Sequence, residues 1–452
     1  MVNTNHQWVG AIMAAGSGTR MGTSKLKPLH EISGRTLIEY VIRSLESIGL
    51  EKLIVIKDHG DDLVNAIRDD KVQFITQDKH DGTGGALKVL LNKLDDHVTD
   101  ILLLNSDVPF IEKDSLDKLT EGHIGKESVF SVLVSNEDSA NGRGILILDD
   151  QGISKEITEK EEQKSTFNSN VLVNVGAYCI NVEWAIDVIN QLETQVNGEI
   201  YITELMSFAF KESKNTSYSF VGNNDESLGI NTLIDLSNAQ KINRKRVLDR
   251  LMLAGVIIED PDSTYIDDTV TVGVDTVIKP GTLLRGDTRI GNNCEIGPGS
   301  QIIDSLVAEN CRVWNSIIEG SILETNVLVG PYSHIRPESY LSNNVKVGNF
   351  SEIKASRLEE GVRMSHFGYI GDASIGARVN LGAGMVTCNY DGTDKNHTTI
   401  GEGSFIGSAT MLVAPIVIGP GSVTGAGSVV ITDVQNGDRV AGVPAKSIGP
   451  KN

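Results

Sequence analysis

Short apolar runs separated by helix-like segments fill the first half of the chain. The runs are VGAIM at 9–13, LIVI at 53–56, FIT at 74–76, ILLL at 101–104, VFSVLV at 129–134, ILIL at 145–148 and VGAYCI at 175–180. Between them, segments 36–49 and 84–94 carry apolar residues at three-to-four spacing, as amphipathic helices do. This alternation predicts an α/β domain with a largely parallel sheet.

The hydrophobic period changes after about residue 260. Aliphatic residues then recur at every sixth position, first at Val272, Ile278, Leu284, Ile290, Ile296 and Ile302, later at Ile400, Ile406, Leu412 and Ile418, slipping to Thr424 and returning at Val430. This period fits neither an α-helix nor an ordinary alternating strand. It fits a coil of triangular cross-section in which each side contributes one inward aliphatic residue. Because 27 of the 46 glycines follow residue 250, we expect glycine at the corners of this coil.

A more polar segment joins the two patterns. It ends on Gly255, which is typical of a helix closed by a glycine C-cap. We therefore predict an α/β domain over 1–232, a linker helix over 233–255 and the coil over 256–452. The six-residue register breaks near 385–399, where CNYDGTDKNHTT predicts a loop expelled from the coil, and such loops often carry function.

Charge and cysteine content narrow the function classes. With 40 Lys and Arg against 60 Asp and Glu, the net charge of −20 argues against nucleic acid and anionic membranes as partners. The four scattered cysteines form no CxxC, so reduced and mostly buried thiols are expected rather than a disulfide framework or a zinc site. The N-terminus lacks a basic signal region and no apolar run is long enough to span a membrane, which predicts a cytoplasmic protein.

A glycine-rich segment, AAGSGTRM at 14–21, follows the first predicted strand. Glycines there let backbone N–H groups approach a phosphate, although a plain tight turn explains the glycines equally well. The nearby segment KLKPL at 25–29 adds Lys27 in a chain that is otherwise strongly acidic. Arg20 and Lys27 together can balance the charge of a triphosphate.

AAGSGTRM followed by LKPL resembles the signature of sugar-1-phosphate nucleotidyltransferases. Combined with a hexapeptide coil, it resembles the bifunctional N-acetylglucosamine-1-phosphate uridyltransferase/glucosamine-1-phosphate acetyltransferase family over roughly residues 8–445. The resemblance implies a Rossmann-like α/β nucleotidyltransferase domain followed by a left-handed parallel β-helix. It also implies that glucosamine 1-phosphate is acetylated by acetyl-CoA. The product then receives UMP from UTP, with release of pyrophosphate, to give UDP-N-acetylglucosamine for cell-wall synthesis.

The resemblance also implies Mg²⁺ as cofactor and a homotrimer with active sites between neighbouring coils. In the first domain it makes Arg20 and Lys27 catalytic and Asp107 and Asn231 metal ligands. Gln77 would bind the uracil edge, because its amide supplies one donor and one acceptor. The implied nucleotide and sugar contacts are Met13, Ala14, Ala15, Gly16, Lys27, Gln77, Gly82, Thr83, Asn105, Ser106, Asp107, Gly142, Glu159, Asn174 and Asn231.

Two of these positions also have independent interpretations. Asp107 ends the run ILLLNSDVP, where open α/β sheets bind ligands and a carboxylate suits Mg²⁺. A turn-forming Asp before Val-Pro is the alternative. Glu159 lies in the charged run EITEKEEQK, which without the resemblance indicates a solvated face.

In the coil, the resemblance makes His366 the general base, for which a neutral imidazole is well matched. Glu352 would orient His366, and Arg336 and Lys354 would hold the sugar phosphate. The sugar and acetyl pocket would comprise Tyr369, Asn380, Asn389 and Tyr390, with Lys395 reaching in from the expelled loop. The acetyl-CoA site would comprise Ala383, Asn389, Tyr390, Ser408 and Ala426. The alternatives are a structural histidine and an ordinary NYDG turn.

Several residues depart from the pattern of this family. Ser17 replaces a common lysine, Gly85 replaces the histidine of GTGHA, and Ser106 replaces the glycine before Asp107. Leu228 replaces an acidic residue. Val443 replaces an arginine that binds the coenzyme A phosphate in some members, and Lys446 is the candidate to take over that contact. Two rival functions stay open. One is a monofunctional nucleotidyltransferase whose coil serves assembly or regulation, and the other is a non-catalytic nucleotide-sugar sensor or scaffold.

Overall fold

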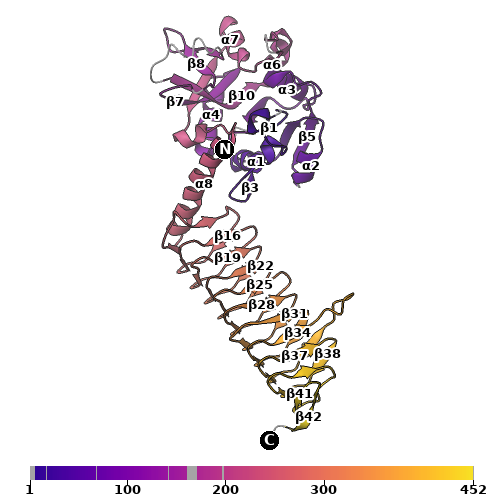
Figure 1. Cartoon of the computed structure of the whole chain (residues 1–452). Coiled ribbons are helices and arrows are strands. Elements are labelled where there is room, and N and C mark those ends of the chain that lie inside the picture. The colour runs from indigo at the N-terminus through magenta and orange to yellow at the C-terminus, as the bar shows by residue number, and fades with distance from the viewer. Residues whose placement is uncertain are drawn as a thin grey trace. The chain divides into compact units, whose positions relative to one another are not determined.

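The computed structural model describes residues 6–16, 18–67, 69–140, 142–159, 171–195 and 198–450. It divides into two compact units, Met1–Ile242 and Asn243–Asn452 (Figure 1). Ser17 lies outside the described residues. Each unit has its own hydrophobic core, and the two units are described separately.

A mixed sheet forms the centre of the first unit, in the order β11-β7-β10-β6-β1-β4-β5. Its strands are β1 (Trp8–Met13), β4 (Leu53–Lys57), β5 (Val72–Thr76), β6 (Asp100–Asn105), β7 (Phe130–Glu137), β10 (Val171–Asn181) and β11 (Thr216–Phe220). Strands β8 (Ile145–Leu148) and β9 (Ser154–Thr158) extend it, and β2 (Glu31–Ile32) pairs with β3 (Arg35–Thr36). The prediction of a largely parallel sheet needs correction, because β10 runs antiparallel to β6, β7 and β8, and β8 runs antiparallel to β9.

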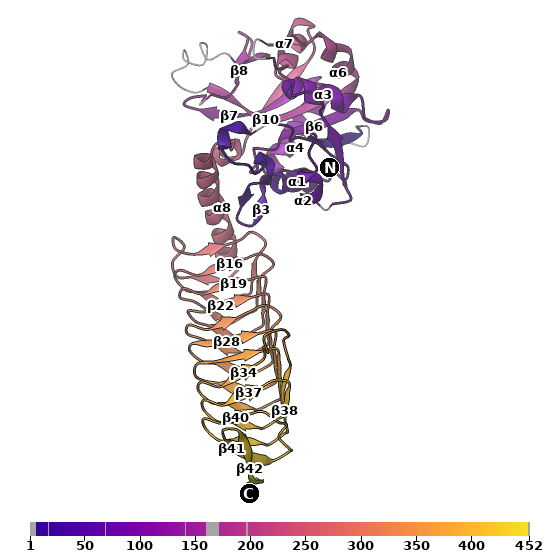
Figure 2. The ribbon, with the colours of Figure 1, turned by 45° about the vertical axis from the view of Figure 1, so that its right-hand side comes forward.

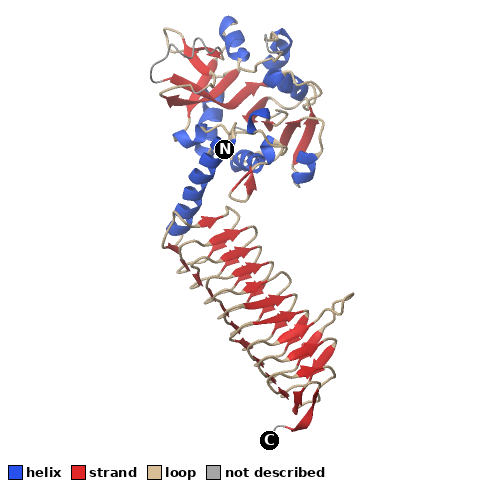
Figure 3. Cartoon of the chain, viewed as in Figure 1, coloured by secondary structure: helices blue, strands red, loops and turns tan. Residues whose placement is uncertain are grey.

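Helices cover both faces of this sheet (Figure 3). One face packs against α1 (Leu37–Ser47), α2 (Asp62–Ala66) and α4 (Lys113–Gly125), the other against α3 (Gly82–Leu91), α6 (Val182–Val188) and α7 (Glu204–Lys211). Short 3-10 helices are η1 (Thr19–Met21), η2 (Lys27–Leu29), η3 (Ile189–Gln191) and η4 (Asn224–Ser227). Helix α1 begins at a capping box between Thr36 and Glu39, which satisfies two of its free N–H groups.

Helix α8 (Leu233–Leu253) contributes to both cores. Ala239 is buried with Met21, Ile32 and Phe110 in the first unit. In the second unit, the side chains from the end of the helix that join the core are Val247, Leu248 and Leu251. The boundary between the two units therefore falls within α8, after Ile242.

The second unit is a coil of short parallel strands stacked into three sheets (Figure 2). The first sheet comprises β12 (Ile257–Ile258), β15 (Val277–Ile278), β18 (Glu295–Ile296), β21 (Arg312–Val313), β24 (Leu328–Val329), β27 (Lys346–Val347), β30 (Arg363–Met364), β33 (Asn380–Leu381), β36 (Phe405–Ile406), β39 (Val423–Thr424), β41 (Asp438–Gly442) and β42 (Ala445–Pro450). Only the closing pair, β41 and β42, is antiparallel among the described strands of this unit.

The other two sheets complete each turn of the coil. The second comprises β13 (Tyr265–Ile266), β16 (Leu283–Arg285), β19 (Gln301–Ile303), β22 (Ile317–Glu319), β25 (His334–Ile335), β28 (Ser351–Lys354), β31 (Gly368–Gly371), β34 (Val386–Cys388), β37 (Met411–Val413) and β40 (Val429–Val430). The third comprises β14 (Thr271–Val272), β17 (Arg289–Ile290), β20 (Leu306–Val307), β23 (Ile322–Leu323), β26 (Tyr340–Leu341), β29 (Arg357–Leu358), β32 (Ala373–Ile375), β35 (Thr398–Ile400) and β38 (Ile416–Ile418).

The six-residue period is confirmed as the inward column of the coil. Ile278 pairs with Ile296 and Leu284 with Ile302, each on the next turn, and all four side chains are fully buried. Stacked aliphatic side chains thus form one continuous core along the coil axis. The loop at 389–397 leaves the coil between β34 and β35, as predicted (Figure 1).

The corners of the coil correct the expectation about glycine. Gly421 adopts the left-handed conformation at φ +69°, but Asn293, Asn310 and Asn344 occupy equivalent left-handed positions without glycine. Asparagine tolerates this conformation better than most residues, so glycine is not required at every corner. Gly382 has a different reason, because a Cβ there would lie 2.5 Å from the backbone N of Ser408 on the next turn. Glycine thus also lets adjacent turns approach closely.

The four cysteines are free thiols, as expected. Cys179, Cys294 and Cys311 are buried and Cys388 is half-buried. Burial raises the pKa of the Cys179 thiol, which keeps it protonated near neutral pH. Within the part of the chain that the structure describes, no helix combines the length and apolar character needed to cross a membrane.

Candidate active sites

A cleft of about 450 Å³ opens at the carboxyl ends of β1 and β6 in the first unit. These strands are adjacent and parallel, and Met13 pairs with Asn105. The segments that follow them therefore leave the sheet at the same edge, where open α/β sheets bind ligands. The lining residues are Met13, Ala15, Gly16, Gly18, Arg20, Lys27, Pro28, Gln77, His80, Gly82, Thr83, Ala86, Asn105, Ser106, Asp107, Glu199, Tyr201 and Asn231.

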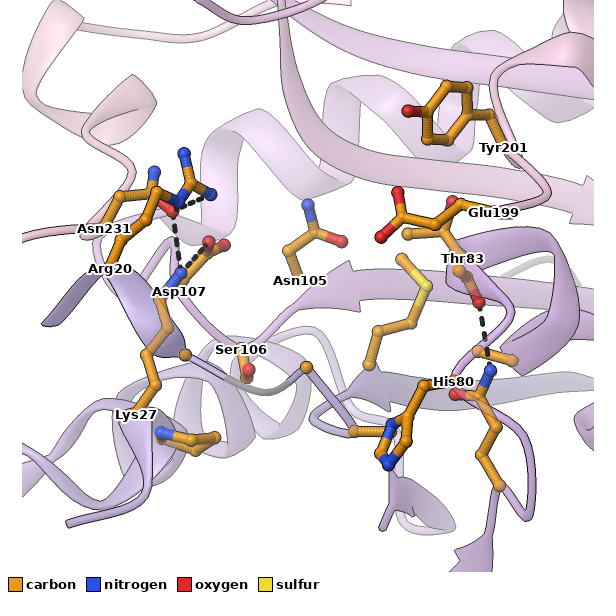
Figure 4. A pocket seen from close by; sticks show the side chains of 18 residues that line it. Arg20, Lys27, His80, Thr83, Asn105, Ser106, Asp107, Glu199, Tyr201 and Asn231 are labelled. Atoms are coloured by element: carbon orange, nitrogen blue, oxygen red, sulfur yellow. Dashed lines mark hydrogen bonds and ion pairs between the residues drawn. The ribbon is translucent and has the colours of Figure 1, made fainter. Parts of the chain in front are cut away.

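Four predicted residues converge at one end of this cleft (Figure 4). Lys27 Nζ donates to Asp107 Oδ2 at 2.6 Å and to Asn231 Oδ1 at 2.9 Å. Arg20 Nη2 donates to the same Asn231 oxygen at 2.8 Å. Lys27 and Asp107 are largely buried, with 13% and 23% of their side chains exposed, so their charges are only weakly screened by solvent. The sequence prediction had placed these residues in one site, and the structure brings them into direct contact.

The backbone holds this cluster from several directions. Gly18 adopts a left-handed conformation, and a Cβ there would lie 2.9 Å from the Cβ of Lys27. Ile230 N donates to the Asp107 carbonyl oxygen at 2.9 Å, which ties the Asn231 segment to the end of β6. Asp235, in the first turn of α8, accepts from the Asn231 N–H at 3.0 Å. The start of α8 therefore fixes Asn231 beside Asp107.

Asp107 and Asn231 fit a site for Mg²⁺. Their oxygens already converge on one cation, the Lys27 ammonium, and carboxylate and amide oxygens are ligands that Mg²⁺ accepts. No cluster of three or more His, Cys, Asp or Glu side chains suited to a metal occurs among the described residues. This ligand set suits Mg²⁺, which is usually held by one or two protein carboxylates together with water and substrate phosphates.

The other end of the cleft carries the predicted base-binding segment. Gly84 N donates to the Ile200 carbonyl oxygen at 2.8 Å, and Ile200 N donates to the Asp81 carbonyl oxygen at 2.7 Å. Thr83 Oγ1 accepts from Ile202 N at 3.0 Å. These bonds fix the backbone around Gly82 and Thr83 at the start of α3. Gln77 lies nearby in the cleft wall and is buried.

A second cavity of about 310 Å³ lies beside the first and is lined by the three predicted sugar contacts, Gly142, Glu159 and Asn174. Asn174 Nδ2 donates to Tyr178 Oη at 2.8 Å, and Asn174 Oδ1 accepts from Gly176 N at 2.9 Å. Burial raises the pKa of Tyr178 well above its usual value, so the phenol stays protonated. The structure therefore places Glu159 in a cavity wall rather than on a solvated face.

Sequence reasoning missed three polar residues that line the first cleft, His80, Glu199 and Tyr201. In Figure 4 they lie with Thr83 at the end away from Lys27, with Asn105 and Ser106 between the two groups. Glu199 and Tyr201 reach the cleft because Ile200, between them, forms backbone hydrogen bonds with Asp81 and Gly84. No local sequence motif predicts this pairing. Their sequence, GEIYI, has no glycine-loop or metal-ligand pattern.

In the second unit, some of the predicted acetyl-transfer residues lie on or beside three neighbouring strands: Glu352 and Lys354 on β28, Tyr369 on β31, and Arg336 just after β25. Arg336, just after β25, donates from Nη1 to Glu352 Oε1 at 2.8 Å. Glu352 is also the register partner of Tyr369 on β31. His366 is exposed, and within the described residues no hydrogen bond joins it to Glu352. In this structure the Glu352 carboxylate thus contacts Arg336 and not the predicted base.

A second group surrounds Lys354. Its ammonium lies 3.7 Å from Asp372 Oδ1, and Asp372 also accepts from the amide of Asn389. Asn389 Nδ2 lies 3.4 Å from Tyr369 Oη. The expelled loop brings Lys395 beside Lys354. Hydrogen-bond contact with the Lys354 side chain, together with the repulsion between the two positive charges, holds the pKa of Lys395 below its usual value. The structure therefore brings Lys354, Tyr369, Asn389 and Lys395 together.

The remaining predicted residues of the coil are spread over other faces and turns. Tyr390 is 63% exposed and donates from Oη to the Gly392 carbonyl oxygen at 2.7 Å. Asn380 lies on β33, in the first sheet, beside Phe405. Ala383 and Ser408 lie beside the same corner on successive turns, since Ala409 N donates to the Ala383 carbonyl oxygen and Gly427 N to that of Ser408. Ala426 lies on the next turn.

Comparison with known proteins matches both units. A family model described as "MobA-like NTP transferase domain" covers residues 10–160, and one described as "GlmU-like, C-terminal hexapeptide" covers residues 292–378. These matches confirm the predicted fold classes of the two parts.

Whole-chain relatives point the same way. The bifunctional protein GlmU of Syntrophomonas wolfei is 37% identical over 426 residues, covering 94% of each chain. That of Caldanaerobacter subterraneus is 37% identical over 430 residues, covering 95% of this chain and 94% of the relative. That of Enterococcus faecalis is 35% identical over 408 residues, covering 90% and 89%. Similarity at this level over nearly the full length shows that the chain belongs to the bifunctional GlmU family.

Proposed function

We propose that the first unit transfers UMP from UTP to N-acetylglucosamine 1-phosphate and that the second unit makes this acceptor from glucosamine 1-phosphate and acetyl-CoA. The observation that carries the first activity is the contact of Lys27 with Asp107 and Asn231 at the carboxyl edge of the sheet. A buried cation beside two oxygen ligands is what a triphosphate with its metal requires.

In the uridylyl transfer, the phosphate oxygen of the sugar attacks the α-phosphorus of UTP. The bond from that phosphorus to the bridging oxygen breaks, and pyrophosphate leaves. Arg20 and Lys27 neutralise the charge of the phosphates, because this reaction needs positioning and charge compensation more than acid–base chemistry. Mg²⁺ held by Asp107 and Asn231 would supply further charge neutralisation. Gly142, Glu159 and Asn174 would bind the sugar, and the 13–16 and 77–83 segments the nucleotide.

In the acetyl transfer, His366 accepts a proton from the sugar amine while the amine nitrogen attacks the thioester carbonyl of acetyl-CoA. The C–S bond then breaks, and the coenzyme A thiolate takes the proton from the His366 imidazolium and leaves as the thiol. We assign substrate binding in this reaction to a cluster of polar side chains that lie together in the structure: Lys354, Tyr369, Asn389 and Lys395. We place Arg336 and Lys354 at the sugar phosphate.

We further propose a cytoplasmic homotrimer. Apolar side chains exposed on the third sheet of the coil support association, among them Leu306, Ile322 and Val417, which are 41%, 42% and 48% exposed. Association between coils would cover them. A cytoplasmic location fits substrates such as UTP and acetyl-CoA, which are made in that compartment.

A coupled assay tests the bifunctional proposal against its rivals. The protein is incubated with glucosamine 1-phosphate, acetyl-CoA, UTP and Mg²⁺, and UDP-N-acetylglucosamine is measured. We expect the nucleotide sugar to form. Turnover only from N-acetylglucosamine 1-phosphate would support a monofunctional nucleotidyltransferase, and no turnover of either acceptor would support a sensor or scaffold. The contacts around Lys354 and Lys395 favour the bifunctional outcome.

A further inference from the structure

Asp81 lies behind the predicted base-binding residue Gln77. The Gln77 side chain is 3% exposed, and its Nε2 donates to Asp81 Oδ1 at 2.8 Å and to the Gly82 carbonyl oxygen at 3.1 Å. An amide nitrogen has two N–H donors. Both donors of Gln77 are therefore used inside the protein.

The two partners also fix the orientation of the amide. A carboxylate and a backbone carbonyl only accept hydrogen bonds, so the nitrogen of Gln77 must face them. The opposite atom, Oε1, has no donor among the residues that the structure describes, and Gln77 lines the cleft. The polar group that Gln77 leaves for a ligand is therefore an acceptor.

Gly85 provides the space that Asp81 occupies. A Cβ built at Gly85 would lie 1.7 Å from Asp81 Oδ1, far inside contact distance. Gly85 lies within α3, and its φ is not in the left-handed region, so its backbone conformation does not require glycine. Glycine weakens a helix interior, and here it allows the Asp81 carboxylate to reach Gln77. The hydrogen bond between Asp81 and Gln77 therefore depends on glycine at position 85, where the family pattern has histidine.

We propose that Asp81 is a positioning residue that makes the nucleotide site selective for uracil over cytosine. This inference rests on the proposed uridylyl transfer. With its amide held by Asp81, Gln77 presents Oε1 alone to the Watson–Crick edge of the base. Uracil offers an N3–H donor at that edge, whereas cytosine has a lone pair on N3. Two acceptors facing each other leave both unpaired, which disfavours cytosine.

The test compares UTP with CTP as nucleotide donor, with N-acetylglucosamine 1-phosphate and Mg²⁺, by pyrophosphate release. In Asp81→Ala the amide keeps only the longer bond to the Gly82 carbonyl oxygen, so Nε2 is held less firmly and can turn towards the base. We expect the ratio of kcat/KM for UTP to that for CTP to fall about tenfold or more, the effect of a hydrogen bond to a charged group. Asp81→Asn keeps an Oδ1 acceptor and should retain most of the selectivity.

Gly85→Ala tests the same arrangement without removing the carboxylate. The new methyl group must displace Asp81, so selectivity should fall as in Asp81→Ala. In the Asp81→Ala background, Gly85→Ala should have little further effect, because the group that it displaces is absent. Gly125→Ala is the matched control, since Gly125 also lies in a helix and a Cβ there meets no atom within 4 Å.

The UTP/CTP ratio is insensitive to a fraction of unfolded protein, which lowers both rates equally. If the wild-type protein uses UTP and Asp81→Ala and Gly85→Ala keep its UTP/CTP ratio, Asp81 does not set base selection, although the uridylyl transfer stands. A wild-type protein that uses CTP as well as UTP overturns the inference in the same way. If the wild-type protein releases no pyrophosphate from UTP, the proposed function itself is refuted and this inference falls with it.

Discussion

The ammonium group of Lys27 lies 2.6 Å from the carboxylate of Asp107 and 2.9 Å from the side-chain oxygen of Asn231. Lys27 begins η2, which comes after β1 in the chain, Asp107 follows β6, and Asn231 immediately precedes the N-cap of α8. Three separate parts of the chain thus meet at one point of the cleft. Binding of a phosphate at this point would compete for the Lys27 donor, so Lys27 is the side chain to change first.

Replacing Lys27 by alanine should lower uridylyl transfer about 10²–10³-fold, the usual effect of removing one donor to developing negative charge. Acetyl transfer should continue unchanged, because its residues lie in the other unit. Pyrophosphate release and coenzyme A thiol release measure the two reactions. The control is Lys25→Ala, since Lys25 is half-exposed and pairs with Glu31. Equal loss of both activities would refute the assignment of two sites.

Removing divalent metal should also separate the two reactions. With EDTA in excess, uridylyl transfer should stop and acetyl transfer persist, because the proposed Mg²⁺ ligands, Asp107 and Asn231, lie in the first site. Asp107→Asn should raise the Mg²⁺ concentration needed for half-maximal rate, since a neutral amide binds the cation less strongly than a carboxylate. Full uridylyl activity in EDTA would rule out the proposed metal site.

Replacing His366 by alanine should lower acetyl transfer about 10²–10⁴-fold, as expected for loss of a general base. Uridylyl transfer by the same preparation serves as the control for folding. Glu352→Gln should have a smaller effect, because Glu352 contacts Arg336 and not His366 in the structure. The assignment of His366 fails if the His366→Ala protein acetylates glucosamine 1-phosphate at the wild-type rate.

Asp100 should make the first unit sensitive to acid. Burial raises its pKa, but hydrogen bonds from His123, His6 and Thr99 outweigh that effect and bring the pKa below its ordinary value of 3.8. Because the folded pKa is the lower one, Asp100 stabilises the fold above pH 3.8, and this contribution is lost as the pH falls below that value.

Urea unfolding from pH 7 to pH 3 measures this contribution. Asp100→Asn should lower the free energy of unfolding at pH 7 by about 1–3 kcal/mol, and the difference from wild type should narrow below pH 4. Asp150→Asn, at an exposed turn, should leave both values nearly unchanged. A difference that stays constant with pH would contradict the role of the Asp100 charge.

Gly382→Ala should destabilise the coil by about 1–3 kcal/mol, the typical cost of overpacking. The new methyl group would lie 2.5 Å from the backbone N of Ser408, and the backbone can move little to relieve the contact. Gly421→Asn is the matched control, because Gly421 is left-handed with open space around it and asparagine tolerates that conformation. Thermal unfolding of the two variants should therefore differ, and equal melting temperatures would argue against close packing at Gly382.

The sequence predicted the coil well because the inward position repeats. Ile278, Ile296 and their equivalents must all point into the same core, so their spacing alone defines the turn. The corners were less predictable, since Asn293 and Asn310 adopt the same left-handed backbone conformation that glycine adopts at other corners. The direction of β10 was not predictable, because apolar alternation reports burial and not which way a strand runs.

The candidate site was predictable only where a motif carried it. Lys27 and Asp107 lie in recognisable segments, and the sheet order places them together. Glu199 and Tyr201 were missed because only the pairing of Ile200 with the 81–84 backbone brings them to the cleft. The Arg336–Glu352 ion pair was also missed, since residues on adjacent turns of a coil meet through register, which single segments do not reveal.

The division of α8 between two cores has a practical consequence for producing either half alone. Val247, Leu248 and Leu251 belong to the same buried core as Val256, Ile258 and Ile266, which begin the coil. A fragment that starts at residue 256 would leave that end of the hydrophobic column open to water and prone to aggregate. A fragment that starts at Asn243 would retain Val247, Leu248 and Leu251. An isolated second unit should therefore begin inside α8 rather than after it.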